Sequence, residues 1–238
     1  MQLTVINASP RRAGSNTRRV LEPFLEGFRS VPGANARCFY IHELATGERV
    51  RELFLGSEAL LLAFPLYCYA LPPAAQRFIY ELEPLRGRGG ARLAFLCQFG
   101  FREACHARAL ERQLAGVCAE LGVENLGMVF RGGCEGLSYR PSFATKRLFA
   151  GFRALGRSLA ERGRWSREEL ERFAAPETSR AGLLTPVKAR IRVAAANYVF
   201  WRAQLRRNGA LARNWDRPLL DEEEGSDSGE RDLRLTSR

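Results

Sequence analysis

Residue types that build most metal and hydrolytic sites are scarce in this sequence. It has only two histidines, His42 and His106, and its six cysteines contain no CxxC pair. No set of these residues has the spacing of zinc ligands, and no Ser-His-Asp or Cys-His arrangement can be assembled from them. The sequence therefore predicts no metal centre and gives no support to a nucleophilic hydrolase.

Two common phosphate-binding patterns and a membrane-spanning segment are also missing. There is no GxGxxG, the fingerprint of dinucleotide-binding Rossmann domains, and no GxxxxGK[ST], the loop of P-loop NTPases. The uncharged run 59–75 is interrupted by Pro65, Pro72 and Pro73 and cannot form a spanning helix. The first apolar stretch ends at Arg11, so we expect no signal peptide.

Lysine is almost absent, although the chain is strongly basic. The formal net charge is +11, and of the 37 basic residues only Lys146 and Lys188 are lysine. This skew toward arginine suggests codon bias, and no nucleic-acid motif accompanies it, so we expect no nucleic-acid partner. The cysteines lie far apart, several within apolar patterns, which favours reduced thiols and a cytoplasmic protein.

Apolar segments alternate with amphipathic ones along the first two thirds of the chain. The 238 residues can hold one domain with an appendage. A near-continuous apolar run at 58–64 is typical of a central parallel strand covered on both faces. The alternation predicts a doubly wound α/β sheet. The expected strands are 3–6, 36–41, 58–64, 91–97 and 125–130, and the expected helices are 16–28, 49–55, 73–81, 102–121 and 143–162.

The stretch 3–17 has the features of a phosphate cradle. A short apolar strand leads into a polar loop and then into a helix, whose first N–H groups have no intrahelical partner and whose dipole is positive at this end. Gly14 would allow tight backbone curvature before the helix cap. The alternative is a corner whose Ser, Asn or Thr merely caps the helix. The donors in the loop are Ser9, Arg11, Arg12, Ser15, Asn16 and Thr17.

The loop NASPRRAGSNT resembles the GSPRxxGNT loop of the flavodoxin-like NAD(P)H-dependent FMN reductases and quinone reductases. The resemblance implies a flavodoxin-like, doubly wound, five-stranded parallel sheet of order 2-1-3-4-5 with a C-terminal helical extension. The loop departs from the family pattern at Ala8, where the family usually has glycine. The resemblance also implies that the FMN phosphate is bound by Ser9, Arg11, Ser15, Asn16 and Thr17.

Two further loops resemble segments that contact the flavin ring in this family. The loop 65–72 is similar to the PxYxxxxP segment along the isoalloxazine, although Cys68 stands where the family often has an aromatic residue. The loop after the next strand resembles the segment that closes over the polar edge of the ring. The structural alternative for the loop 65–72 is the aromatic end of a buried strand. For the loop after the next strand, the alternative is a turn glycine beside a solvated glutamine. The implied ring contacts are Pro65, Leu66, Tyr67, Cys68, Tyr69, Gln98, Phe99 and Gly100.

The loop 131–136 is glycine-rich and carries Glu135, which is either a proton donor or an ordinary solvated carboxylate. Beyond it, we expect a flavodoxin-like FMN-binding domain over 1–164, a helical extension over 165–218 and a disordered tail over 219–238. The extension contains a linker at 176–185 and a basic amphipathic helix at 186–207. Such a helix can lie on a membrane or pack on this chain or on a dimer mate, and we favour packing.

The function that the resemblance implies is an FMN-dependent NAD(P)H oxidoreductase. FMN would be the cofactor and NAD(P)H the co-substrate, with electrons passed to a quinone, a flavin or a similar small-molecule acceptor by a ping-pong mechanism. A homodimer is expected, and no single catalytic residue stands out because the cofactor carries the chemistry. The alternatives are a flavodoxin-type electron carrier, disfavoured by the basic charge because flavodoxins are usually acidic, and a cofactor-free interaction module.

Overall fold

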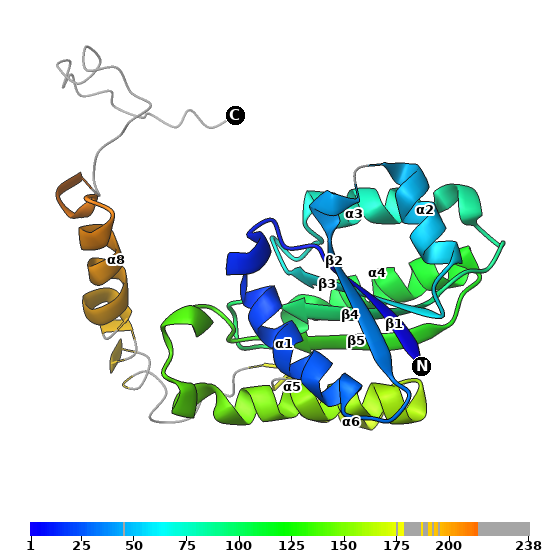
Figure 1. Cartoon of the computed structure of the whole chain (residues 1–238). Coiled ribbons are helices and arrows are strands. Elements are labelled where there is room, and N and C mark those ends of the chain that lie inside the picture. The colour runs from blue at the N-terminus through cyan, green and yellow to red at the C-terminus, as the bar shows by residue number, and fades with distance from the viewer. Residues whose placement is uncertain are drawn as a thin grey trace, which may run out of the picture. The chain divides into compact units, whose positions relative to one another are not determined.

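The computed structural model of the protein describes residues 1–44, 46–174, 176–178, 187, 190–191, 193–194 and 196–213. It divides into two compact units, Met1–Ser179 and Arg180–Arg238. The first unit contains a five-stranded parallel sheet with helices on both faces (Figure 1). The described part of the second unit is helical.

All neighbouring strands of the sheet pair in parallel, and their order is β2-β1-β3-β4-β5. The predicted strand order is therefore confirmed. Every residue of β3 is buried, as its apolar sequence requires for a central strand. The strands are β1 (Gln2–Asn7), β2 (Asn35–Tyr40), β3 (Ala59–Pro65), β4 (Arg92–Gln98) and β5 (Asn125–Arg131).

The helices follow the predicted alternation, and half of their predicted ends shift by one to three residues. The start of α4 moves from the predicted residue 102 to Cys105, because residues 99–101 pair with the loop after β5 instead. The α-helices of the first unit are α1 (Asn16–Arg29), α2 (Gly47–Leu55), α3 (Pro73–Tyr80), α4 (Cys105–Leu121), α5 (Ser142–Arg162) and α6 (Arg167–Phe173). Its 3-10 turns are η1 (Arg12–Gly14), η2 (Ile41–Glu43), η3 (Glu83–Leu85) and η4 (Leu137–Tyr139).

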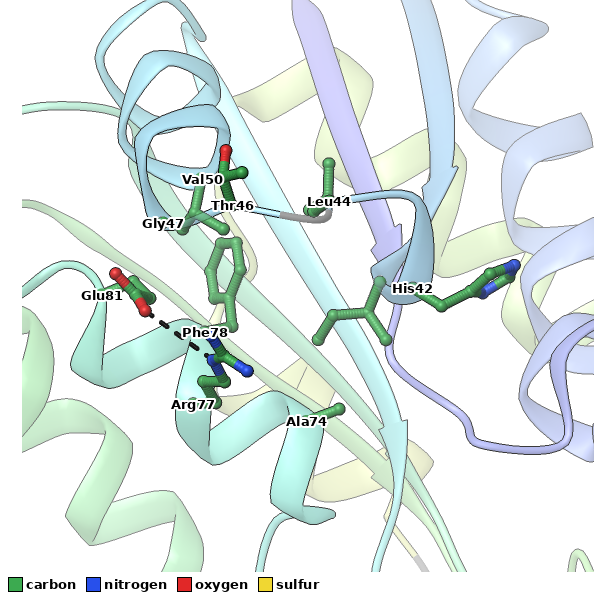
Figure 2. Close-up of a pocket in the computed structure, with 10 residues that line it drawn as sticks. His42, Leu44, Thr46, Gly47, Val50, Ala74, Arg77, Phe78 and Glu81 are labelled. Carbon is green, nitrogen blue, oxygen red and sulfur yellow. Dashed lines mark ion pairs between the residues drawn. The ribbon is translucent and has the colours of Figure 1, made fainter.

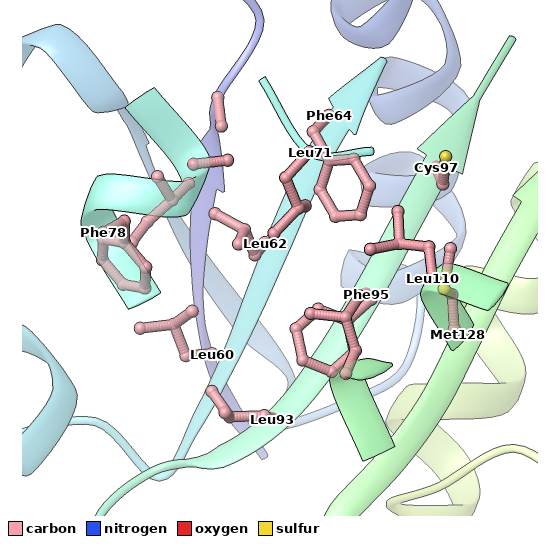
Figure 3. Packing of buried hydrophobic residues seen from close by; sticks show 14 of the residues in the cluster. Leu60, Leu62, Phe64, Leu71, Phe78, Leu93, Phe95, Cys97, Leu110 and Met128 are labelled. Carbon is pink, nitrogen blue, oxygen red and sulfur yellow. The ribbon is translucent and has the colours of Figure 1, made fainter. Parts of the chain in front are cut away.

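Alternate residues of β3 point into two separate cores. Leu60, Leu62 and Phe64 pack with side chains of α3 and α4, including Phe78 and Leu110 (Figure 3). Leu61 and Ala63 face the opposite core, which α1 and α5 cover. Burying one such leucine or phenylalanine side chain contributes about 1.5–3 kcal/mol. The two cores hold the strand ends, and hence the loops that follow them, in a fixed arrangement.

Helices α1 and α5 approach each other so closely that two glycines are required at their contact. A Cβ atom on Gly27 would lie 1.9 Å from the carbonyl oxygen of Arg153, and one on Gly156 would lie 1.9 Å from the carbonyl oxygen of Phe24. An ion pair of 2.5 Å between Glu26 and Arg153 flanks the contact. Because the polar loop 8–15 leads into α1, this contact positions the beginning of the candidate phosphate site.

The first unit extends past residue 164, the predicted domain boundary. Trp165 is 4% exposed, and its indole Nε1 donates a hydrogen bond of 2.9 Å to the carbonyl of Leu155. Phe173 of α6 packs edge-on against Phe152, with 4.8 Å between ring centroids. The segment that follows α5 therefore belongs to the core of the sheet domain.

The second unit contains a π-helical turn, η5 (Ala196–Trp201), then α8 (Arg202–Arg207) and a 3-10 turn, η6 (Leu211–Arg213). Tyr198 and Trp201 are exposed within it, and the Arg202 guanidinium lies 5.8 Å from the Tyr198 ring centroid. The predicted linker beyond 178 and the predicted tail at 219–238 lie outside the described residues. Within the part of the chain that the structure describes, no helix combines the length and apolarity needed to cross a membrane.

Three of the six cysteines are buried, and they give the stability of the fold a predicted pH dependence. Burial raises the pKa of Cys118 and of Cys134 to about 12, and that of Cys97 well above the usual range of a thiol. In the unfolded chain these thiols ionise at about pH 8.5. Above that pH the folded state holds more protons than the unfolded state, so rising pH destabilises the fold.

We therefore expect the free energy of unfolding to fall by about 1.4 kcal/mol per pH unit for each buried thiol between about pH 9 and 12. Urea denaturation at several pH values in this window measures the slope. In the variant Cys118→Ala, the free energy of unfolding should fall less steeply with pH, by about 1.4 kcal/mol per pH unit. A dependence on pH identical to that of the parent protein would contradict this account.

Candidate functional site

Three polar or aromatic loops meet at the carboxyl edge of the sheet, where the strand order reverses. They follow β1, β3 and β4, which are adjacent strands. The Ala8 N–H donates to the carbonyl of Ala63 at 2.8 Å, and the Leu66 N–H donates to the carbonyl of Gln98 at 3.0 Å. Ligands of open α/β sheets bind at such a reversal point. The loops that the sequence predicted as neighbours are therefore neighbours in the structure.

The first loop folds into consecutive tight turns before α1. The Arg12 N–H donates to the carbonyl of Ser9, and the Ser15 N–H donates to the carbonyl of Arg12, each at 3.1 Å. The left-handed residue in this loop is Arg12, with φ of 49°, and not Gly14, where tight curvature was expected. Arg11 and Arg12 are exposed at the surface of the loop.

The polar side chains at the start of α1 are bound within the protein. The Ser15 hydroxyl caps the helix by accepting a hydrogen bond of 3.1 Å from the Arg18 N–H. Its contact with a phosphate stays a prediction. Asn16 donates through Nδ2 to the carbonyl of Cys134 at 2.9 Å. The N–H groups of Asn16 and Thr17 lie in the first turn and have no intrahelical acceptor. An anion at this end of α1 would find these two donors together with the exposed Arg11.

A buried hydrogen bond joins the first loop to the third. The Gln98 side chain donates through Nε2 to the Thr17 hydroxyl at 3.2 Å, and both residues are buried. Ser9 is buried as well, and its N–H donates to the Asn7 carboxamide at 3.0 Å. Gln98 is therefore not a solvated glutamine, because its buried side chain braces the cradle. Its contact with a ring edge stays a prediction.

The second loop is a tight β-hairpin whose tip has an unusual backbone. Tyr67 and Ala70 exchange two backbone hydrogen bonds, of 3.1 and 2.9 Å. Cys68 and Tyr69 between them both have positive φ, 48° and 62°, as in a type I′ turn. Glycine or asparagine normally occupies these positions, and another residue there costs about 1–2 kcal/mol. Such strain is often found at functional sites.

The hairpin belongs to an aromatic cluster centred on His106, at the start of α4. The His106 ring stacks on Phe101 at 4.6 Å between centroids and lies 5.3 Å from Tyr69 and 6.4 Å from Phe99. Tyr69 and Phe101 are 59% and 65% exposed, so the cluster presents aromatic surface to solvent. From residue spacing alone, His106 comes into question only as a metal ligand. Its place directly after the third loop was the signal that it belongs to this site.

The glycine-rich loop after β5 is fixed against the third loop. The Cys134 N–H donates to the carbonyl of Phe99 at 2.8 Å, and the Gly133 N–H donates to that of Phe101 at 2.7 Å. A Cβ atom on Gly132 would lie 2.1 Å from the Phe101 carbonyl oxygen, so only glycine fits there. Glu135 is exposed beside this contact.

Comparison with solved structures identifies the fold. An NAD(P)H:quinone oxidoreductase from Methanothermobacter marburgensis is similar at a TM-score of 0.55 and 19% identity, covering 67% of this chain and 96% of that one. An FMN-dependent NADH-azoreductase from Bacillus anthracis str. Ames Ancestor, in complex with FMN, is similar at 0.52 and 14%, covering 67% and 100%. An azoreductase from Bacillus anthracis str. Sterne is similar at 0.51 and 14%, covering 66% and 99%. The chain has a flavodoxin-like fold. No family model and no curated protein matches it.

A small cavity of about 240 Å³ lies between η2, α2 and α3. Its wall is both apolar and charged, with Val50 and Phe78 near the ion pair of Arg77 and Glu81, whose charged atoms are 3.7 Å apart (Figure 2). Figure 2 also shows the His42 ring pointing away from this ion pair. None of the residues implied to contact flavin lines this cavity.

Proposed function

We propose that the protein is an FMN-dependent NAD(P)H oxidoreductase. The observation that carries this proposal is the junction of three loops at the carboxyl edge, where the buried bond between Gln98 and Thr17 connects the helix N-terminus to the ring loops. Two of the similar structures are described as an NAD(P)H:quinone oxidoreductase and as an FMN-dependent azoreductase. The similarity of these structures to this chain supports the assignment of the fold. The residues of the three loops support the proposal that FMN is the cofactor.

The cradle before α1 fits a phosphate group. The free N–H groups of Asn16 and Thr17 lie at the positive end of a 14-residue helix, and the exposed Arg11 lies in the loop that leads into it. A Thr17 hydroxyl that accepts from Gln98 keeps its own proton for donation to an anion. The buried Ser9 contributes to the shape of the loop through the hydrogen bond from its N–H to Asn7.

The hairpin and the His106 cluster fit an aromatic ring system. The N–H groups of Leu66, Tyr67 and Ala70 already donate within the protein, so the N–H groups of Cys68 and Tyr69 at the tip are the ones offered to a ring edge. Aromatic side chains here would stack on a planar ligand and exclude water from one side of it. We assign Tyr67, Tyr69 and His106 to this role.

When bound, FMN would take two electrons from NADPH or NADH and deliver them to a second substrate. The exposed aromatic surface suits a flat acceptor such as a quinone, and donor and acceptor would occupy the same face in turn, which is a ping-pong mechanism. We also propose that the protein is cytoplasmic and dimeric. A flavodoxin-type electron carrier is the second candidate, and the net charge of +11 counts against it because such carriers are usually acidic.

Addition of NADPH or NADH to the FMN-loaded protein under anaerobic conditions separates these functions. A reductase loses the visible flavin absorbance rapidly with at least one donor and regains it when a quinone is added. Flavin that stays oxidised with both donors would overturn the reductase and favour the carrier. Absence of FMN binding would overturn both and favour a cofactor-free interaction module.

The variant Tyr69→Gly should separate stability from flavin binding. Glycine relieves the positive φ at the hairpin tip, so we expect stabilisation of about 1 kcal/mol. The same change removes a stacking ring, so FMN affinity should fall by roughly five- to tenfold, given about 1 kcal/mol for an aromatic contact. Urea denaturation without FMN and flavin fluorescence titration measure the two effects. A glycine variant that binds FMN as tightly as the parent protein would remove Tyr69 from the site.

A further inference from the structure

A second and larger cavity lies at the β5 edge of the sheet, and arginines dominate its wall. Its volume is about 720 Å³, and it is enclosed by the loops after β4 and β5, the first turns of α5 and the end of α6. No carboxylate is among the residues that line it. The arginines in the wall are Arg102, Arg131, Arg140, Arg147 and Arg172.

Most of these arginines have no carboxylate partner within the part of the chain that the structure describes. Arg172 pairs with Glu168 at 2.5 Å, whereas the other four form no ion pair with any carboxylate that the structure describes. Arg131 donates to the carbonyl of Phe173 at 2.5 Å, and Arg140 donates to that of Glu135 at 2.9 Å. These bonds to neutral carbonyls orient two guanidinium groups and leave their charge uncompensated.

The charges in this wall act on one another. Burial lowers the pKa of the Arg131 guanidinium, and the charges of Arg102 and Arg147 lower it further. Like charges held this close repel, and an anion between them would relieve the repulsion. A cavity under α6 and α4 provides the contrast, because there Glu111 and Glu171 share the wall with the arginines.

We propose that this arginine cavity is a binding site for a phosphorylated ligand carrying at least two negative charges. Arginine presents planar pairs of N–H donors that match phosphate oxygens, and the beginning of α5 adds the positive end of a helix dipole. The cavity is large enough for a diphosphate or for a phosphorylated nucleoside. None of the residues that line it belongs to the proposed phosphate cradle for FMN. The two sites are connected by the loop after β5.

That shared loop connects the cavity to the proposed flavin site. Gly132 and Gly133 line the arginine cavity, and the next carbonyl, that of Cys134, accepts the hydrogen bond from Asn16 of the cradle. Two sources of phosphate are therefore consistent with the position: the phosphates of a nicotinamide dinucleotide donor, and a free phosphorylated compound. The first source rests on the proposed function, and the second does not.

The test is calorimetric titration of the full chain with pyrophosphate and with adenosine 2′,5′-bisphosphate, the phosphorylated half of NADPH. The variant Arg102→Gln/Arg147→Gln removes two exposed cavity arginines, and Arg88→Gln/Arg112→Gln removes two exposed arginines that do not line the cavity. We expect both probes to bind the parent protein and the control variant, and at least one to bind the cavity variant about tenfold more weakly or worse.

The pattern of losses distinguishes the sources. Weakening of the bisphosphate, together with a rise in the Michaelis constant for NADPH but not for NADH, would assign the cavity to the 2′-phosphate of the donor. Weakening of pyrophosphate alone would assign it to a free phosphorylated compound. Equal affinities in the cavity and control variants, or no binding of either probe at millimolar concentration, would overturn the proposal. FMN affinity, titrated separately, should be the same in both variants, and its absence in all proteins would overturn the proposed function only.

Discussion

Replacing Gly156 with alanine is expected to destabilise the protein strongly. The new Cβ atom would lie 1.9 Å from the carbonyl oxygen of Phe24, and backbone on α1 cannot move aside as a flexible side chain can. Overpacking of this kind costs about 3 kcal/mol or more. We expect Gly156→Leu to prevent folding, and Gly156→Ala to show a much lower urea midpoint.

A matched glycine serves as the control for this result. Gly116 lies within α4, and a Cβ atom there would meet no atom within 4 Å. Because glycine is unfavourable inside a helix, Gly116→Ala should stabilise the fold by about 0.5–1 kcal/mol. Opposite signs at Gly116 and Gly156 would confirm the close contact of α1 and α5. Equal tolerance of alanine at both positions would contradict it.

The second large effect is expected in the phosphate cradle. The variant Arg11→Ala removes an exposed guanidinium that makes no hydrogen bond within the described structure, so it should leave the fold intact. Loss of a charge-assisted bond to phosphate costs about 1.5–3 kcal/mol, which weakens FMN binding about ten- to a hundredfold. Arg18→Ala is the control, because Arg18 is also exposed on this segment but pairs with Glu22 at 2.8 Å. Equal FMN affinity in both variants would remove Arg11 from the site.

Thr17 needs a different substitution, because its hydroxyl also holds the fold together. In Thr17→Ala the buried Gln98 amide loses its acceptor, which costs about 1–3 kcal/mol of stability on top of any loss of flavin affinity. Thr17→Ser keeps a hydroxyl and should retain both properties. The double variant Arg11→Ala/Thr17→Ala is therefore expected to lose FMN binding and stability together, and the serine variant shows which loss belongs to the ligand.

The sheet and the meeting of three loops at its carboxyl edge could be predicted from sequence because both depend on local patterns. The apolar run of β3 requires cover on both faces, and alternation with amphipathic helices makes the strands parallel. The carboxyl edge then follows from topology, so the loops after β1, β3 and β4 could be placed together before their geometry was known. That the residues of those loops bind FMN stays a prediction.

Other features depend on contacts that no local pattern encodes. The left-handed turn at Cys68 and Tyr69 has neither asparagine nor glycine to signal it. Trp165 was assigned to the extension because the sequence around it is polar, yet its indole bonds to Leu155 in the core. The arginine cavity combines residues from four separate segments, between Gly100 and Phe173, and only the folded chain brings them together.

The measurement that tests the central claim most directly is titration of FMN with the purified full chain, followed by flavin fluorescence. Our account predicts saturable quenching that ends at one FMN per chain, weaker in Arg11→Ala and unchanged in Arg18→Ala. Riboflavin, which has the same ring but no phosphate, should bind at least about tenfold more weakly, since it lacks the charge-assisted bonds of the cradle. Quenching by neither compound, or equal binding of riboflavin and FMN, would contradict the assignment of the loop before α1 as a phosphate site.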